Sequence, residues 1–237
     1  MEHLLLHTDP RQRAQVHVKD GLWLPSPMPG VSRLPLHRSG AESAQATTLV
    51  RYAPGSHFSP HMHEGGEEFI VLEGTFRDEH GAYPAGTYVR NPPGSRHAPS
   101  APQGCLLFVK LRQFDPLDRA ASRHFIGSGP FTMPQACAGL SQELLHEDAR
   151  ERVTVETWSP GLWRLIDLPE GGELLMLDGE VAEPGGLLRR HDWLRLPPGS
   201  QLQARAGAHG ARLWLKQGHL SVLASGPGLP TFPQAKP

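Results

Sequence analysis

Four residues in the first half of the chain have the types and the spacing of a transition-metal site: His61, His63, Glu67 and His97. Successive side chains of a β-strand point to opposite faces, so His61 and His63 would project from the same face and reach one ion. Glu67 follows a short loop with two glycines and adds a carboxylate nearby. Three imidazoles and a carboxylate suit zinc, iron, manganese, nickel or copper better than calcium or magnesium. The spacing therefore predicts a metal site.

The surrounding sequence predicts strands and turns that could bring these four side chains together. The turn sequence Asn91–Ser95 stands just before His97 and could carry a neighbouring strand across the same interior. Apolar runs of strand length occur at Phe69–Leu72 and Leu106–Val109. With 24 prolines and 26 glycines, the composition fits an all-β protein with many turns. The best helix candidate is the short segment Ser141–Arg152.

Two motifs around the four residues match those of the cupin superfamily. The first is Gly55, five residues, His61, one, His63, three, Glu67, six and Gly74. The second is Gly86, five residues, Pro92, one, Gly94, two and His97, with Ala101 where the family usually has Asn. The resemblance implies a small jelly-roll barrel with His61, His63, Glu67 and His97 as the metal ligands.

Within the cupins, residues 49–97 and 104–114 resemble the metal-binding domain of the ChrR anti-sigma factors and their cupin-only relatives. The resemblance implies zinc as the usual metal. In ChrR proteins, sigma-factor binding belongs to a separate N-terminal helical domain with its own Cys and His zinc site. The segment Met1–Gly30 is too short for such a domain and contains no Cys. We therefore expect no sigma-factor partner.

The chain also resembles itself. Tyr88–His97 recurs as Trp193–Leu202, and Glu68–Gly74 recurs as Glu173–Gly179, both at an offset of 105 residues. Leu202 replaces His97 in the second copy, and the copy of the HMH segment has no His. We therefore predict two tandem cupin barrels: a metal-binding domain at 1–118 and a degenerate, metal-free domain at 119–237, with a crossing linker at 114–138.

Other features limit the location and the partners of the protein. The 23 basic and 24 acidic residues give a net charge of −1, which predicts no direct nucleic-acid or anionic-membrane partner. The apolar start of the chain is too short for a signal peptide, and no run approaches a membrane span, so we expect a cytoplasmic protein.

Cys105 and Cys137 lack the close spacing of a zinc or redox pair. We expect a homodimer, or a pseudo-dimer formed within one chain.

Several secondary positions can be placed from strand alternation alone. Phe69 and Val71 share a face with Glu67 and should form the apolar wall of the metal cavity. Tyr52, Phe58 and Arg51 are near enough in sequence to line its mouth, although packing or surface roles are the simpler interpretation. The segment from Asp78 to Gly81 indicates a β-turn with solvated charges, without further ligands.

The predicted metal site is compatible with three kinds of function. Four protein ligands would close a tetrahedral zinc site, whereas octahedral iron, manganese or nickel would keep about two positions for other molecules. The ChrR resemblance favours a module that senses or binds a small molecule or an oxidant, with a role in transcriptional regulation. The alternative is a metal-dependent dioxygenase of the acetylacetone (β-diketone) cleaving type. In the third interpretation the metal only stabilises the fold.

Overall fold

The computed structural model describes residues 4–41, 44–134 and 137–221, and these residues are almost entirely β. The exceptions are short helical turns, η1 (Val18–Asp20) and residues 219–221. The predicted helix at 141–152 is wrong: most of the segment belongs to β16 (Leu140–Glu147), and its last residue opens β17 (Arg152–Trp158). Burial alternates along β16, with Glu143 and Leu145 buried and Leu144 exposed, which is the period of a strand.

The strands form two large antiparallel sheets and one small one. The first large sheet has eleven strands, ordered β1 (Leu4–Leu6), β4 (Val31–Gly40), β5 (Ala46–Tyr52), β13 (Cys105–Leu111), β8 (Glu67–Asp78), β10 (Thr87–Asn91) and β14 (Ser122–Phe125). Its remaining strands are β3 (Leu24–Pro25) on β4, β9 (Gly81–Pro84) on β8, and β12 (Ser100–Ala101) on β8 and on β6 (Ser56–His57). The small sheet pairs β7 (His61–His63) with β11 (Ser95–His97).

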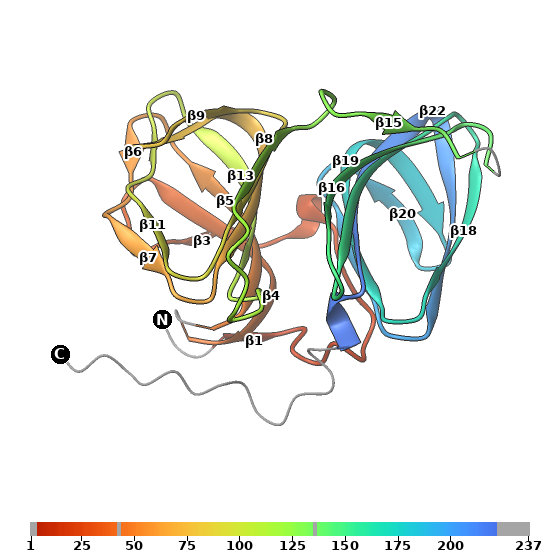
Figure 1. The fold of residues 1–237 in the computed structure, drawn as a ribbon, viewed down its shortest axis with the longest axis horizontal. Helices are drawn as coiled ribbons and strands as arrows, with labels where there is room; N and C mark the ends of the chain where they lie inside the picture. The colour runs from red at the N-terminus through yellow and green to blue at the C-terminus, as the bar shows by residue number, and fades with distance from the viewer. Residues whose placement is uncertain (1–3, 42–43, 135–136, 222–237) are drawn as a thin grey trace.

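The second large sheet has nine strands, ordered β15 (Phe131–Thr132), β16, β17, β22 (Ser200–Gln217), β19 (Gly172–Glu183), β21 (Trp193–Leu196) and β2 (Ala14–Val16), with β18 (Trp163–Leu168) on β22 and β20 (Gly186–Arg189) on β19. Figure 1 shows the two large sheets as curled lobes that lie side by side. Among the described strands, neither large sheet closes into a hydrogen-bonded ring. The all-β class is confirmed, and the two tandem barrels stay an interpretation of these curled sheets.

Each large sheet contains one strand from the other half of the sequence. β2, near the N-terminus, pairs with β21 in the second sheet, and β14 pairs with β10 in the first. The predicted linker at 114–138 is therefore partly structured, because it supplies β14 and β15; its residues 135–136 lie outside the described residues. The boundary between residues 118 and 119 stays a prediction.

The internal repeat of the sequence recurs in the strand bounds. β19 and β20 begin and end 105 residues after β8 and β9. Gly74 and Gly179 occupy equivalent positions with φ of +71° and +69°, and a Cβ on either would lie 2.2 Å from a carbonyl oxygen, that of Gly104 or Gly210. Only glycine fits such a conformation and such a close approach of two backbones.

The two lobes meet through a shared apolar core and a reciprocal pair of buried ion pairs. The core joins residues of both lobes, among them Phe108 and Trp214, whose ring centroids lie 5.2 Å apart. The Nζ of Lys110 lies 2.5 Å from Oε2 of Glu173, and the Nζ of Lys216 lies 2.6 Å from Oε2 of Glu68. Within the sheets, Lys110 lies opposite Glu68 on the neighbouring strand, and Lys216 lies opposite Glu173. The lobes thus exchange equivalent contacts, as in a twofold-symmetric interface.

Candidate metal centre

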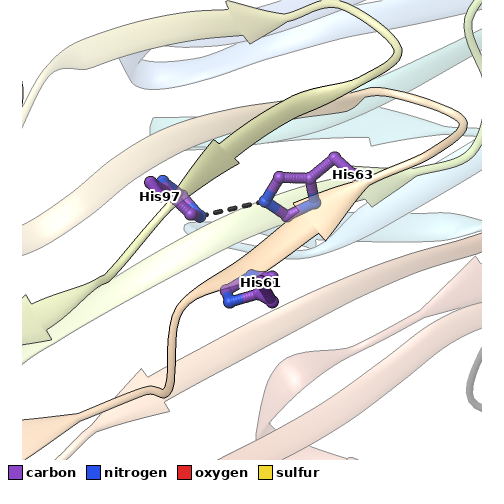
Figure 2. A group of neighbouring side chains, drawn as sticks. All are labelled: His61, His63 and His97. Carbon is purple, nitrogen blue, oxygen red and sulfur yellow. Dashed lines mark hydrogen bonds between the residues drawn. The ribbon is translucent and has the colours of Figure 1, made fainter.

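Three of the predicted ligands converge from two neighbouring strands. In the β7–β11 pair, His61 lies opposite His97, and His63 lies opposite Ser95. One ring nitrogen from each histidine lies within 4.8 Å of the others, and the Nε2 atoms of His63 and His97 are 2.9 Å apart. Figure 2 shows the three imidazoles turned toward one another. The pairing of β7 with β11 and the alternation of side chains along each strand are therefore enough to assemble the cluster.

The carboxylate of Glu67 lies beside this cluster. Its Oε2 atom is 3.4 Å from Nε2 of His63 and 3.7 Å from Nε2 of His97, and Nδ2 of Asn91 donates a hydrogen bond to the same oxygen at 3.0 Å. Ligand atoms about 2.1 Å from one ion would be separated by roughly 3.0–3.4 Å. The donor set and its spacing thus fit a divalent transition metal.

Hydrogen bonds on the outer side of the rings fix which nitrogen faces the centre. Nδ1 of His61 donates to the carbonyl oxygen of Ser59 at 2.8 Å, and Nδ1 of His97 lies 3.2 Å from Oδ2 of Asp78. A ring whose Nδ1 carries the proton presents a lone pair at Nε2, as a metal requires. The hydroxyl of Tyr83 donates to Asp78 as well, at 3.0 Å.

Asp78 corrects one of the sequence predictions. Its side chain was expected in solvent, but only 3% of it is exposed, because β11 brings His97 against the end of β8. Residues 79 and 80 do form the predicted turn. No local feature of the sequence distinguishes a buried aspartate at this position from an exposed one, since the burial depends on a residue 19 positions away.

Burial keeps the ligand groups in the protonation states that bind metal. It lowers the pKa of His63 to about 3, and the positive charges of His61 and Arg112 act in the same direction. Burial also lowers the pKa of His97, although the nearby Glu67 carboxylate opposes this shift. Burial raises the pKa of Glu67. The two buried imidazoles are therefore neutral near pH 7, and a cation would favour loss of the Glu67 proton.

The cluster opens into a cavity of about 240 Å³. Tyr52 and Phe58 line it, whereas Arg51 is exposed and its guanidinium stacks over Trp23 at 4.2 Å. Phe69 and Val71 do not line the cavity and pack in the core behind it. The apolar lining comes instead from other residues, namely Val31, Val50, Phe76, Leu107, Val109 and Leu111. A metal on the histidines would therefore face a largely apolar chamber.

The second lobe has apolar side chains at the equivalent positions. Ile166 pairs with Leu202 in the register that joins His61 to His97 in the first lobe. Both residues, together with Leu168, are buried in the core of the second lobe. Within residues 4–41, 44–134 and 137–221, His61, His63 and His97 form the only cluster of three or more metal-ligating side chains. The first lobe is therefore the candidate metal-binding half.

Comparison with protein families agrees with this geometry. The model of the ChrR Cupin-like domain matches residues 11–115, which include all four candidate ligands. Residues 11–115 of the chain are a ChrR-like cupin domain. The family resemblance inferred from the sequence is therefore confirmed. No curated protein matches the chain.

Solved structures with the same fold include several cupins of low sequence identity. A candidate dioxygenase from Nostoc punctiforme PCC 73102 is 14% identical and has a TM-score of 0.68, with 100% of this chain and 87% of the other covered. The pirin YhhW of Escherichia coli in complex with nickel(II) is 16% identical, with a TM-score of 0.64 and coverages of 87% and 98%. Oxalate decarboxylase of Bacillus subtilis is 12% identical, with a TM-score of 0.60 and coverages of 86% and 76%. At these identities the likeness concerns the cupin fold.

Two further features bear on the remaining sequence predictions. Cys105 and Cys137 are free thiols, and burial raises the pKa of Cys105 to about 12, so its thiol stays protonated at neutral pH. None of the helical segments among the described residues has the length and apolarity that a bilayer crossing requires.

Proposed function

We propose that the first lobe of this ChrR-like cupin binds one divalent transition metal through His61, His63, Glu67 and His97, and a small molecule in the cavity beside it. The observation that carries the proposal is that the ligand cluster opens into a chamber of about 240 Å³. A purely structural zinc site is closed by its protein ligands and needs no such space. Zinc is the metal we expect first, and iron, manganese or nickel suit the same donors.

We further propose that the protein works as a sensing or binding module, because the wall of the cavity is also the interface with the second lobe. On β8, Glu67 faces the metal cluster, while the next residue, Glu68, bonds Lys216 of the second lobe at 2.6 Å. On β13, Leu111 lines the cavity, while Lys110 bonds the second lobe. A shift of either strand on binding would therefore move buried charges at the interface. Such a module could act in transcriptional regulation through a protein partner.

Hydrogen exchange tests this coupling. Loading the metal-free protein with zinc should increase the protection of amides in β8 and also in β19 and β22 of the second lobe. The Glu67→Gln variant should lose both effects together, while Glu64→Gln, which changes an exposed carboxylate paired with Arg112, should keep them. Protection confined to the first lobe would contradict a sensing role that involves the second.

A dioxygenase is the second candidate, favoured by the room that the cavity leaves beside an octahedral metal. Three imidazoles and one carboxylate would leave iron about two positions for substrate and oxygen. The fold shared with a candidate dioxygenase is compatible with this activity. Anaerobic loading with Fe(II), followed by acetylacetone and oxygen, should then give oxygen consumption that His61→Ala abolishes. Absence of uptake by the iron-loaded protein would remove this candidate.

We also infer that the two lobes are tandem cupin barrels that reproduce a cupin dimer within one chain. The support is the recurrence of strand bounds at 105 residues and the reciprocal Lys–Glu pairs between the lobes. Because the pseudo-symmetric faces already cover each other, we expect a particle of 25.9 kDa in light scattering. A mass twice this value would show that a further interface exists.

A further inference from the structure

We propose that the cavity selects an aromatic molecule with an uncharged body and about ten non-hydrogen atoms, which binds the metal through two neighbouring oxygen atoms. The inference rests on the proposed metal-dependent function and specifies its ligand class. Three properties of the cavity carry it: its apolar and aromatic wall, its volume and the pairing of its charged side chains. Four protein ligands would leave an octahedral metal about two positions, which two oxygens of one ligand can fill.

The wall beside the metal cluster consists largely of apolar side chains from three neighbouring strands. On β13, strand alternation turns Leu107, Val109 and Leu111 to the cavity. Val50 of β5 lies opposite Leu107 and is only partly buried by its neighbours in the core. Val31 of β4 lines the same cavity. An apolar ligand body against this wall would be favourable, because contact removes the apolar surface of both from water.

Aromatic side chains flank the candidate metal ligands. The ring centroid of Phe58 lies 5.0 Å from that of His61, and the ring centroid of Phe76 lies 5.9 Å from that of His97. Both phenylalanines line the cavity. Aromatic rings attract one another in offset or edge-to-face arrangements at centroid distances of about 4.5–7 Å. A flat ring attached to the metal-binding oxygens would therefore meet both aromatic and aliphatic surfaces.

The volume of the cavity sets the size of the ligand. A dry cavity of about 150 Å³ holds benzene, so a cavity of about 240 Å³ holds about ten non-hydrogen atoms at the same packing. One benzene ring with a small head that carries two oxygens has about this size. A larger molecule would have to extend out of the cavity into solvent.

The charged side chains of the lining already have partners. Arg112 bonds Glu64 at 2.7 Å, and Arg38 donates hydrogen bonds to two backbone carbonyl oxygens. Arg33 is engaged as well, and Glu67 belongs to the candidate metal site. A charge on the body of the ligand would therefore be taken from water into the cavity without a counterion, which is unfavourable. The cavity thus favours an uncharged body.

Three hydroxamates that share one metal-binding head test these properties. Acetohydroxamate carries the head on a methyl group, benzohydroxamate on a benzene ring, and glutaric acid monohydroxamate on a chain that ends in a carboxylate. The last two have the same number of non-hydrogen atoms. Each probe is titrated by calorimetry at pH 7 into nickel(II)-loaded protein, whose nickel content is first verified by elemental analysis. Nickel is used because an octahedral ion keeps two positions for the head.

Benzohydroxamate should bind at least about thirtyfold more tightly than acetohydroxamate. Each methylene-sized group removed from water raises the affinity about fourfold, so burial of half of the additional ring surface gives a factor of about thirty. Glutaric acid monohydroxamate should bind no more tightly than acetohydroxamate, because the cations of the lining are already paired.

A substitution in the wall assigns the preference to the cavity. Val50→Thr keeps the shape of the side chain but puts a hydroxyl into the wall, so benzohydroxamate should bind about fivefold more weakly or worse. Nickel content and acetohydroxamate affinity should stay unchanged, because Val50 is not a metal ligand and the methyl probe buries little surface. Val16→Thr is the matched control, since it makes the same change at a partly buried valine of β2, outside the cavity lining.

The outcomes separate this inference from the function on which it rests. Absence of bound nickel would contradict the proposed metal site itself. Full nickel content with equal affinity for acetohydroxamate and benzohydroxamate would overturn only the inference of an aromatic ligand. Equal affinity for benzohydroxamate and glutaric acid monohydroxamate would overturn its uncharged character. An equal loss of benzohydroxamate binding in Val50→Thr and Val16→Thr would overturn the assignment to the cavity wall.

Discussion

Replacing Asp78 by Asn should weaken metal binding without touching any metal-ligating residue. The carboxylate of Asp78 lies 3.2 Å from Nδ1 of His97 and is 3% exposed, so it holds the proton on the outer nitrogen of the ring. An amide in its place can donate to Nδ1 and so stabilise the tautomer that carries its proton on Nε2, where the metal needs a lone pair. Loss of such a supporting contact typically costs 10–100-fold in metal affinity, or about 1.4–2.8 kcal/mol.

Competition with a chromophoric zinc chelator at pH 7.5 measures this effect directly. Glu79→Gln is the matched control, because it removes the same charge from the next residue and Glu79 contacts the backbone of Ala98 instead of an imidazole. Tyr83→Phe should give a smaller loss, since it removes only one bond to Asp78. Unfolding in EDTA checks that the variants remain folded. A zinc affinity of Asp78→Asn within about threefold of wild type would refute the supporting role of Asp78.

Three further predictions concern stability. Lys110→Met should destabilise the protein by about 3–5 kcal/mol in urea unfolding, because the buried Glu173 carboxylate loses its partner at 2.5 Å. Burial lowers the pKa of His63 to about 3 and of His37 to about 4, against about 6.5 in the unfolded chain, which therefore binds more protons below pH 6.5. In metal-free protein the free energy of unfolding should therefore fall when the pH is lowered from 6 to 5. Each of the two histidines should contribute about 1.4 kcal/mol to this decrease. Gly74→Ala should cost more than about 2 kcal/mol in the same assay, because its φ is +71° and its Cβ would meet a carbonyl oxygen at 2.2 Å.

Each of these predictions has a control or an outcome that would contradict it. Arg152→Ala is the control for Lys110→Met, because it breaks an exposed ion pair with Glu147 and should change stability by no more than about 1 kcal/mol. If Lys110→Met changed stability by no more than this control, the interface pair would contribute little. Stability of the metal-free protein that does not change from pH 6 to 5 would contradict the neutral buried histidines. Gly94→Ala has a similar φ of +88° with open space around it, so it should cost less than Gly74→Ala.

The sequence predicted most of the centre because its ligands stand in two short motifs with fixed residue types and spacing. His61 and His63 are two apart on one strand, and the turn before His97 returns the chain beside them, so type and spacing were sufficient. The sequence also predicted the repeat, which needs only self-comparison. The helix prediction at 141–152 failed because most of the segment pairs with β17, and this contact with a later strand outweighs the local sequence.

Long-range contacts account for what the sequence did not show. Lys110 and Lys216 read as ordinary surface residues of strands, and only the meeting of two lobes buries them against Glu173 and Glu68. These two ion pairs have no local signal in the sequence, because the fold places each partner.

Metal content of the protein purified without a His tag tests the central claim most directly. Elemental mass spectrometry should find about one divalent transition metal per chain, most of it zinc. The variant His61→Ile/His97→Leu introduces the residues that the second lobe has at the same register, and it should stay folded without metal. Metal at full occupancy in this variant, or wild-type protein that takes up no transition metal when supplied with it, would contradict the account.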